Sequence, residues 1–217
     1  MTIKSIITAR GGSKGIPNKN LILLKGKPLI YYSITESLKS VVDETWVSSD
    51  SDEILNISSG YGAKVLKRPD SLADDIIMPD GAVKHFAENI IADYIIFIQP
   101  TSPLISYKDI NNGIKYLKKN NYDSIFAARV DHWVPSWNEE IGGNLKTESW
   151  DINNRPRRQD RENAIIEIGM FYISRRDLIL KTGLRYGGNI GYYKIPLNRS
   201  FQIDSIEDVE LVEKLLC

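Results

Sequence analysis

Short apolar runs alternate along the chain with segments whose apolar positions recur at helical spacing. Strands are predicted at residues 3–9, 44–48, 63–66, 94–98, 123–129, 167–174 and 192–196. Helices are predicted at residues 28–40, 50–60, 80–91, 109–119 and 176–182, with a last helix from Ser205. This alternation is typical of βαβ units and predicts a mostly parallel central sheet with helices on both faces.

One strand and one interruption refine this picture. Residues 94–98 are apolar throughout, which predicts a strand covered on both faces and therefore near the sheet centre. The alternation stops between about residues 131 and 163, where Trp133, Trp137 and Trp150 stand among prolines and glycines without a clean period. We therefore predict a single domain, residues 1–217, with an inserted arm at about 131–163.

Composition excludes several classes of protein. The 217 residues carry 28 basic and 28 acidic side chains, a balance that argues against a nucleic-acid-binding protein. The single cysteine, Cys217, excludes an internal disulfide framework and a cysteine-based zinc site. The longest apolar run is far shorter than the roughly 20 residues that cross a bilayer, and the first residues lack the apolar stretch of a signal peptide. The expectation is a soluble cytoplasmic protein.

The segment after the first predicted strand carries the clearest chemical signal. It reads Arg10-Gly-Gly-Ser-Lys-Gly-Ile-Pro, followed by Lys19-Asn20, and it precedes a helix. Glycines let backbone N–H groups approach phosphate oxygens, and Arg10, Lys14 and Lys19 supply the opposing charge. The loop matches neither G-x-G-x-x-G nor G-x-x-x-x-G-K-[ST]. It predicts a phosphate-binding site at the first βα turn of an α/β sheet.

This loop closely resembles the N-terminal signature of the acylneuraminate cytidylyltransferase family, the CMP-sialic acid synthetases. Further resemblances follow in the family's order: Ser48-Ser-Asp-Ser-Asp-Glu-Ile, Gln99-Pro-Thr-Ser-Pro-Leu, Arg155-Pro-Arg-Arg-Gln-Asp160, Gly169-Met-Phe-Tyr172, Gly187-Gly188 with Tyr192-Tyr193, and Phe201-Gln-Ile-Asp-Ser. The likeness extends almost from end to end of the chain. It implies the Rossmann-like nucleotide-diphospho-sugar transferase fold, with the inserted arm serving dimerisation.

The resemblance also implies a reaction. CTP and a nonulosonic acid, which is sialic acid or a relative such as legionaminic or pseudaminic acid, would give the CMP-sugar and pyrophosphate with Mg²⁺. Attack of the anomeric hydroxyl on the α-phosphorus is an in-line displacement, so the protein mainly positions the reactants and neutralises charge. The sequence leaves the particular acid open.

Site residues are carried over by position. The nucleotide-binding set is Arg10, Gly11, Gly12, Ser13, Lys19, Asn20 and Arg68. Arg10 and Lys19 are assigned to the charge on the leaving pyrophosphate, and Asp204 is the metal ligand, which makes these three the catalytic residues.

The sugar-binding set is Gln99, Thr101, Ser102, Arg158, Gln159 and Tyr172. Arg158 suits a carboxylate because a guanidinium offers paired N–H donors. Since the family's arm crosses to a neighbouring subunit, a homodimer with a shared active site is implied.

The chain also departs from the family. Many relatives have Asp-Ile-Asp where this chain has Gln202-Ile-Asp204, so Gln202 offers an oxygen without charge and the number of metal ions stays open. Ile168 replaces an asparagine near the sugar site, and residues 75–79 replace a Ser/Thr-rich stretch. Asp50, at a predicted helix start, is expected to be a cap more readily than a metal ligand.

Two alternatives stay open. One is a 3-deoxy-manno-octulosonate cytidylyltransferase, although that family generally has an acidic residue in its central motif and Gln99-Pro-Thr-Ser-Pro has none. The other is a catalytically silent nucleotide-binding protein of the same fold, a reading that Gln202 favours and Asp204 opposes.

Overall fold

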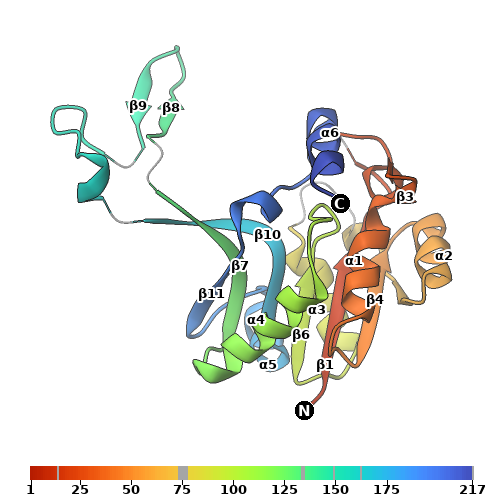
Figure 1. The fold of residues 1–217 in the computed structure, drawn as a ribbon. Coiled ribbons are helices and arrows are strands. Elements are labelled where there is room, and N and C mark those ends of the chain that lie inside the picture. Colours follow the sequence, from red (N-terminus) through yellow and green to blue (C-terminus); the bar gives the residue numbers. More distant parts are fainter. Residues whose placement is uncertain (14, 73–77, 133–134, 149, 162, 217) are drawn as a thin grey trace.

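The computed structural model describes residues 1–13, 15–72, 78–132, 135–148, 150–161 and 163–216. A seven-stranded sheet in the order β11-β7-β10-β6-β1-β4-β5 runs through it (Figure 1). The strands are β1 (Ile3–Thr8), β4 (Glu44–Ser49), β5 (Lys64–Lys67), β6 (Tyr94–Ile98), β7 (Ser124–Asp131), β10 (Ala164–Arg175) and β11 (Ile190–Lys194). Neighbouring strands are parallel, except that β10 is antiparallel to both β6 and β7. The predicted mostly parallel α/β architecture is confirmed.

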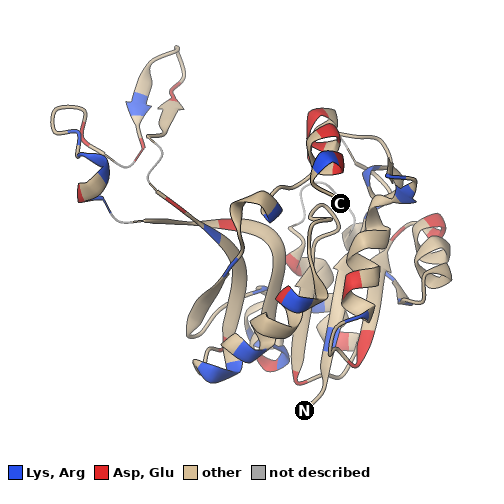
Figure 2. Ribbon diagram, viewed as in Figure 1, with Lys and Arg blue, Asp and Glu red and all other residues tan. Residues whose placement is uncertain are grey.

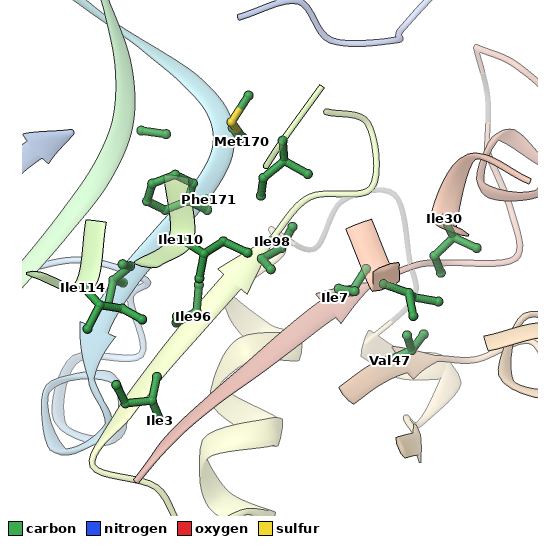
Figure 3. Close-up of a cluster of buried hydrophobic side chains, with 14 of the residues drawn as sticks. Ile3, Ile7, Ile30, Val47, Ile96, Ile98, Ile110, Ile114, Met170 and Phe171 are labelled. Atoms are coloured by element: carbon green, nitrogen blue, oxygen red, sulfur yellow. The ribbon is translucent and has the colours of Figure 1, made fainter. Parts of the chain in front are cut away.

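Helices cover both faces of this sheet. They are α1 (Leu29–Leu38), α2 (Asp52–Gly60), α3 (Asp80–Asn89), α4 (Tyr107–Lys119), α5 (Arg176–Thr182) and α6 (Ile206–Leu215). Successive side chains of a strand point to opposite faces. In β1, Ile3 and Ile7 therefore join the core under α1, α2 and α4, whereas Ile6 joins the core under α3 and α5. Figure 3 shows part of the first of these two cores.

The central strand is the one that the sequence predicts. β6 spans Tyr94–Ile98, as predicted, and has three strands on either side. Its side chains alternate between the two cores, with Ile96 and Ile98 on one face and Ile95 and Phe97 on the other. The carboxyl ends of β1 and β6 consequently lie side by side at one edge of the sheet.

Capping side chains set the helix starts. Ser106 and Asp109 form a capping box, so α4 begins at Tyr107 and the predicted start at Asp109 is wrong by two residues. Ser205 and Asp208 form a second capping box at the start of α6. This helix packs Val212 against Leu24, next to the short ribbon of β2 (Leu23–Leu24) and β3 (Lys27–Pro28).

An arm leaves the sheet between β7 and β10. It contains a hairpin of β8 (Trp137–Glu139) and β9 (Leu145–Thr147), followed by the 3-10 turn η3 (Arg158–Asp160). Figure 1 shows both elements well away from the sheet, on the side opposite to β1 and β4. The remaining 3-10 turns are η1 (Lys19–Leu21), η2 (Asp70–Leu72) and η4 (Leu197–Arg199). Among the described residues, no helix has the length and apolar content that crossing a bilayer requires.

Candidate active site

The glycine-rich loop begins where β1 ends. Its first part is held by two side chains from different elements: the Gly11 N–H donates to Asp50 Oδ1 at 3.2 Å, and Asn20 Nδ2 donates to the Arg10 carbonyl at 3.0 Å. A Cβ on Gly11 would lie 3.1 Å from Ser51 Cβ, which is tight for any other residue. At Gly12 a Cβ would meet nothing within 4 Å, so that part of the backbone faces open space. Lys14 lies outside the described residues.

A cleft of about 320 Å³ opens at this edge of the sheet. Residues predicted for the nucleotide and for the sugar line it together: Arg10, Ser13, Lys19, Asn20, Arg68, Gln99 and Thr101. Its other lining residues are Thr8, Leu72, Met78, Pro79, Phe97 and Pro100. The topology explains the convergence, because open α/β sheets bind ligands beyond the carboxyl ends of their parallel strands.

Arg68 is the most buried cation of the cleft. It is 5% exposed, and Nη2 donates to Asp50 Oδ1 at 3.3 Å. Burial lowers the pKa of the Arg68 guanidinium, and the positive charge of Arg10 lowers it further, while Asp50 raises it. Arg68 Nε has no hydrogen-bond partner within the described part of the chain. The guanidinium groups of Arg10 and Arg68 repel each other beside the cleft, and a bound anion would relieve this repulsion.

Asp50 braces this cationic group, and its predicted role as a helix cap is wrong. Ser51 is the N-cap of α2, and its Oγ accepts from the Ile54 N–H at 3.4 Å. The carboxylate of Asp50 instead contacts Gly11 N and Arg68 Nη2. Both residues suit the start of a helix, and the tertiary contacts of Asp50 decide which of them caps it.

Lys19 and Asp204 meet at the rim of the cleft although 185 positions separate them. Lys19 Nζ lies 2.8 Å from Asp204 Oδ1, and the side chains are 17% and 68% exposed, respectively. A Cβ on Gly15 would lie 3.1 Å from the Asp204 carbonyl oxygen, so the loop and the Asp204 segment are in direct contact. Within the described ranges, no three His, Cys, Asp or Glu side chains are grouped closely enough to hold a metal by themselves.

The end of the cleft that holds Gln99 and Thr101, the residues predicted to bind the sugar acceptor, is built where β6 meets β10 and is called the acceptor end. Gln99 follows β6, and its N–H donates to the Met170 carbonyl at 3.3 Å. The Thr101 carbonyl accepts from the Ile203 N–H at 2.9 Å, which brings the segment before Asp204 to the same place. Ser102 is buried, and its hydroxyl has no hydrogen-bond partner among the residues described.

Tyr172 lies beneath this end and does not line the cleft. Its ring stacks on Phe97 with centroids 5.5 Å apart, and its hydroxyl donates to Glu167 Oε1. Burial raises the pKa of the Tyr172 hydroxyl, and the hydrogen bond to Glu167 raises it further, so the group stays protonated.

An ion pair that the sequence does not predict, between Arg185 and Asp80, packs under the same end of the cleft as Tyr172. Arg185 Nε lies 3.1 Å from Asp80 Oδ1, and the guanidinium lies over the rings of Tyr172 and Phe97 at 5.1 and 5.5 Å. Asp80 opens α3 directly after Met78 and Pro79, which line the cleft. Because 105 positions separate Arg185 from Asp80, no local pattern in the sequence predicts that they pair.

Arg158 and Gln159 do not line the cleft of their own chain. They lie in η3, and both are exposed. Figure 2 shows basic residues on this part of the arm, away from the sheet. The structure thus brings five residues predicted for the nucleotide together with Gln99 and Thr101 in one cleft, namely Arg10, Ser13, Lys19, Asn20 and Arg68. Gly11, Gly12 and Ser102 do not line this cleft, and Arg158 and Gln159 lie apart from it.

Comparison with known proteins decides the family. A model of the family described as cytidylyltransferase matches residues 5–216. The chain belongs to the cytidylyltransferase family. It is 37% identical to N-acylneuraminate cytidylyltransferase A of Danio rerio over 98% of this chain and 50% of that protein. It therefore spans about half the length of the curated vertebrate relatives that it matches.

Two bacterial relatives match over nearly their whole length. The pseudaminic acid cytidylyltransferase of Campylobacter jejuni is 31% identical, covering 97% of this chain and 94% of that protein. The CMP-N,N'-diacetyllegionaminic acid synthase of Legionella pneumophila is 32% identical, covering 100% and 97%. Among solved structures, a CMP:2-keto-3-deoxy-manno-octonic acid synthetase complexed with CTP has a TM-score of 0.76 at 17% identity and covers 100% of this chain and 98% of that one, a likeness of fold.

Proposed function

We propose that this cytidylyltransferase uses CTP to activate a nonulosonic acid to its CMP-sugar, with release of pyrophosphate. The observation that carries the proposal is the shared cleft, in which the glycine-rich loop and Arg68 face Gln99 and Thr101 across one space. The named activities of the relatives concern sialic, pseudaminic and legionaminic acids, all within this substrate class.

The proposed chemistry needs positioned charge more than a reactive side chain. The anomeric hydroxyl attacks the α-phosphorus of CTP and loses its proton, and the bond to the β-phosphate bridging oxygen breaks. The Gly11 N–H is engaged by Asp50, so the backbone N–H groups of Gly12 and Ser13 are the ones assigned to the phosphates, and Arg10, Lys19 and Arg68 offset the charge that moves onto the pyrophosphate. Because Asp50 holds Arg68 and the loop backbone before the substrate arrives, these groups reorganise little during the reaction.

Magnesium is part of the proposal, with Asp204 as its protein ligand. Mg²⁺ commonly takes one or two carboxylates and completes its shell with water and phosphate oxygens, so an exposed carboxylate at the rim of the cleft fits it. When bound there, the ion supplies charge neutralisation at the triphosphate. Lys19, now paired with Asp204, is free to bind phosphate once a cation occupies that carboxylate.

A homodimer that shares its active sites is also proposed. Arg158 and Gln159 lie in η3 on the arm, which stands away from the sheet (Figure 1), and neither lines the cleft of its own chain. We therefore assign their sugar-binding role to the cleft of a second copy. The arm exposes large apolar side chains that water does not favour, namely Trp137, Ile141, Leu145 and Ile152. Trp137 and Trp150 pack edge to face with centroids 5.1 Å apart and give the arm a local core.

Incubation with CTP, Mg²⁺ and a panel of ulosonic acids tests the proposal. Pyrophosphate release with at least one nonulosonic acid is expected, and the eight-carbon 3-deoxy-manno-octulosonate should be a poorer substrate. Tight CTP binding without release for any acid would favour the silent nucleotide-binding protein. The absence of nucleic-acid binding and the cytoplasmic location stay predictions.

A further inference from the structure

The strand β10 contains a large bulge beside the acceptor end of the cleft. Its ladder with β7 pairs Glu167 with Ala128 and then Tyr172 with Phe126, so residues 168–171 stand opposite Ala127 alone. Such a bulge takes backbone groups out of the ladder and leaves them in need of other partners.

A side chain from a distant segment satisfies one of these groups. The carbonyl of Ile168, a buried residue, accepts a hydrogen bond from the side-chain amide Nε2 of Gln202, 34 positions away. A buried carbonyl without a partner costs more free energy than an ordinary hydrogen bond contributes. Gln202 is therefore part of what holds the bulge in shape.

The next residue in the bulge brings a second amide into this arrangement. Gly169 has φ 64°, a left-handed conformation that favours glycine. A Cβ at Gly169 would lie 2.5 Å from Gln99 Oε1 and closer still to Gln202 Nε2. The amide groups of Gln99 and Gln202 thus both lie where a side chain at residue 169 would begin, and Gln99 lines the cleft.

Gln202 also lies on the segment that joins the two ends of the cleft. Its neighbour Ile203 donates to the Thr101 carbonyl at 2.9 Å, and Asp204 contacts Lys19 at 2.8 Å. Along this segment, the side chain of residue 202 is directed to the acceptor end and that of residue 204 to the glycine-rich loop.

We propose that Gln202 is a positioning residue of the acceptor end, whose amide fixes the Ile168–Gly169 bulge and thereby the orientation of the Gln99 amide. This rests on the proposed function, because it takes Gln99 to face the acceptor sugar. In this role the amide nitrogen of Gln202 is engaged by the backbone of the bulge, and the carboxylate that contacts Lys19 of the loop is Asp204.

Replacement by glutamate provides the kinetic test. Gln202→Glu keeps the size of the side chain but sets a carboxylate oxygen against the Ile168 carbonyl. The KM for the acceptor acid should rise roughly ten- to hundredfold. The KM for CTP and the affinity for Mn²⁺ in the presence of CTP, titrated by electron paramagnetic resonance, should stay within about twofold of wild type. Asn198→Asp, the same change of amide to carboxylate at an exposed nearby position, is the matched control.

Amide hydrogen exchange provides a readout that does not depend on turnover. In Gln202→Glu, and in Gln202→Met if the glutamate lowers the melting temperature, exchange should quicken in residues 165–171 and stay unchanged in residues 19–24. Tighter Mn²⁺ binding, an altered KM for CTP with an unchanged acceptor KM, or unchanged exchange in the bulge would overturn the proposal. If wild type turns over no acid at all, the proposed function fails, while the exchange result still decides the role of Gln202 in the bulge.

Discussion

The two ends of the cleft differ in how many of their predicted binding residues come from a single chain. At the nucleotide end, the loop, Asn20, Asp50 and Arg68 hold one another through hydrogen bonds within the chain. At the acceptor end, Gln99 and Thr101 are in place, but Arg158 lies on an arm that reaches away from the body. Under the proposed function, one copy would suffice to bind CTP, and two copies would be needed to bind the acceptor and react.

The largest effect is expected at the junction of the two ends. Asp204→Asn should lower turnover by roughly hundredfold or more and raise the Mg²⁺ concentration needed for half-maximal rate, because the variant lacks the anionic ligand. The fold should persist, since the carboxylate is largely exposed. Steady-state rates across a Mg²⁺ series measure both quantities, and wild-type rates at limiting Mg²⁺ would contradict the metal assignment.

A smaller effect is expected when Arg158, on the arm, is replaced. Arg158→Ala should raise the KM for the sugar acid roughly tenfold to hundredfold, through the loss of a paired hydrogen bond to a carboxylate, with CTP affinity unchanged. If it weakened CTP alone, the arm would serve the other substrate.

Subunit mixing sharpens this prediction. A heterodimer of Arg158→Ala with Lys19→Met contains one site with both residues intact, so at a sugar-acid concentration near the wild-type KM it should recover about half the wild-type turnover. The parent variants, assayed alone, are the controls. A heterodimer no more active than its parents would mean that each arm serves its own chain.

The smallest effect on activity is expected beneath the cleft. Burial alone opposes ionisation of Asp80, but hydrogen bonds from the Arg185 side chain and backbone outweigh it, so the pKa of Asp80 lies below its ordinary value. The stability that Asp80 contributes is therefore fully present above the ordinary carboxyl pKa of about 4 and is lost as the pH falls through the lowered value.

Asp80→Asn tests this assignment. It should lower the free energy of unfolding by about 3 kcal/mol at pH 7, because it leaves Arg185 buried without its counter-charge, and the difference from wild type should shrink in acid. Chemical unfolding at pH 7 and pH 3 measures it. A difference that grew in acid would show that the sign is wrong.

Much of the nucleotide end follows from local sequence. Glycines, cations and the end of a predicted strand stand together in residues 9–20, and the alternation of strands and helices predicts the parallel sheet whose carboxyl edge binds ligands. Asp50 shows the limit: its residue type suits a cap, and only the folded chain reveals that it contacts Gly11 and Arg68.

The acceptor end is harder to predict from the sequence, because contacts between residues far apart in the chain shape it. Asp80 with Arg185 and Ile168 with Gln202 depend on how β10 is placed, and the pattern of its side chains is the same for a parallel and an antiparallel strand. The strands β8 and β9 have three residues each, too few for a period to emerge from the arm sequence.

A crystal structure with a non-hydrolysable CTP analogue and Mn²⁺ tests most directly whether the glycine-rich loop and Asp204 bind the triphosphate and its metal ion. We expect triphosphate oxygens on the Gly12–Ser13 backbone and on Arg68, with an anomalous Mn²⁺ peak at the Asp204 carboxylate. A triphosphate bound elsewhere, or a metal peak remote from Asp204, would contradict it.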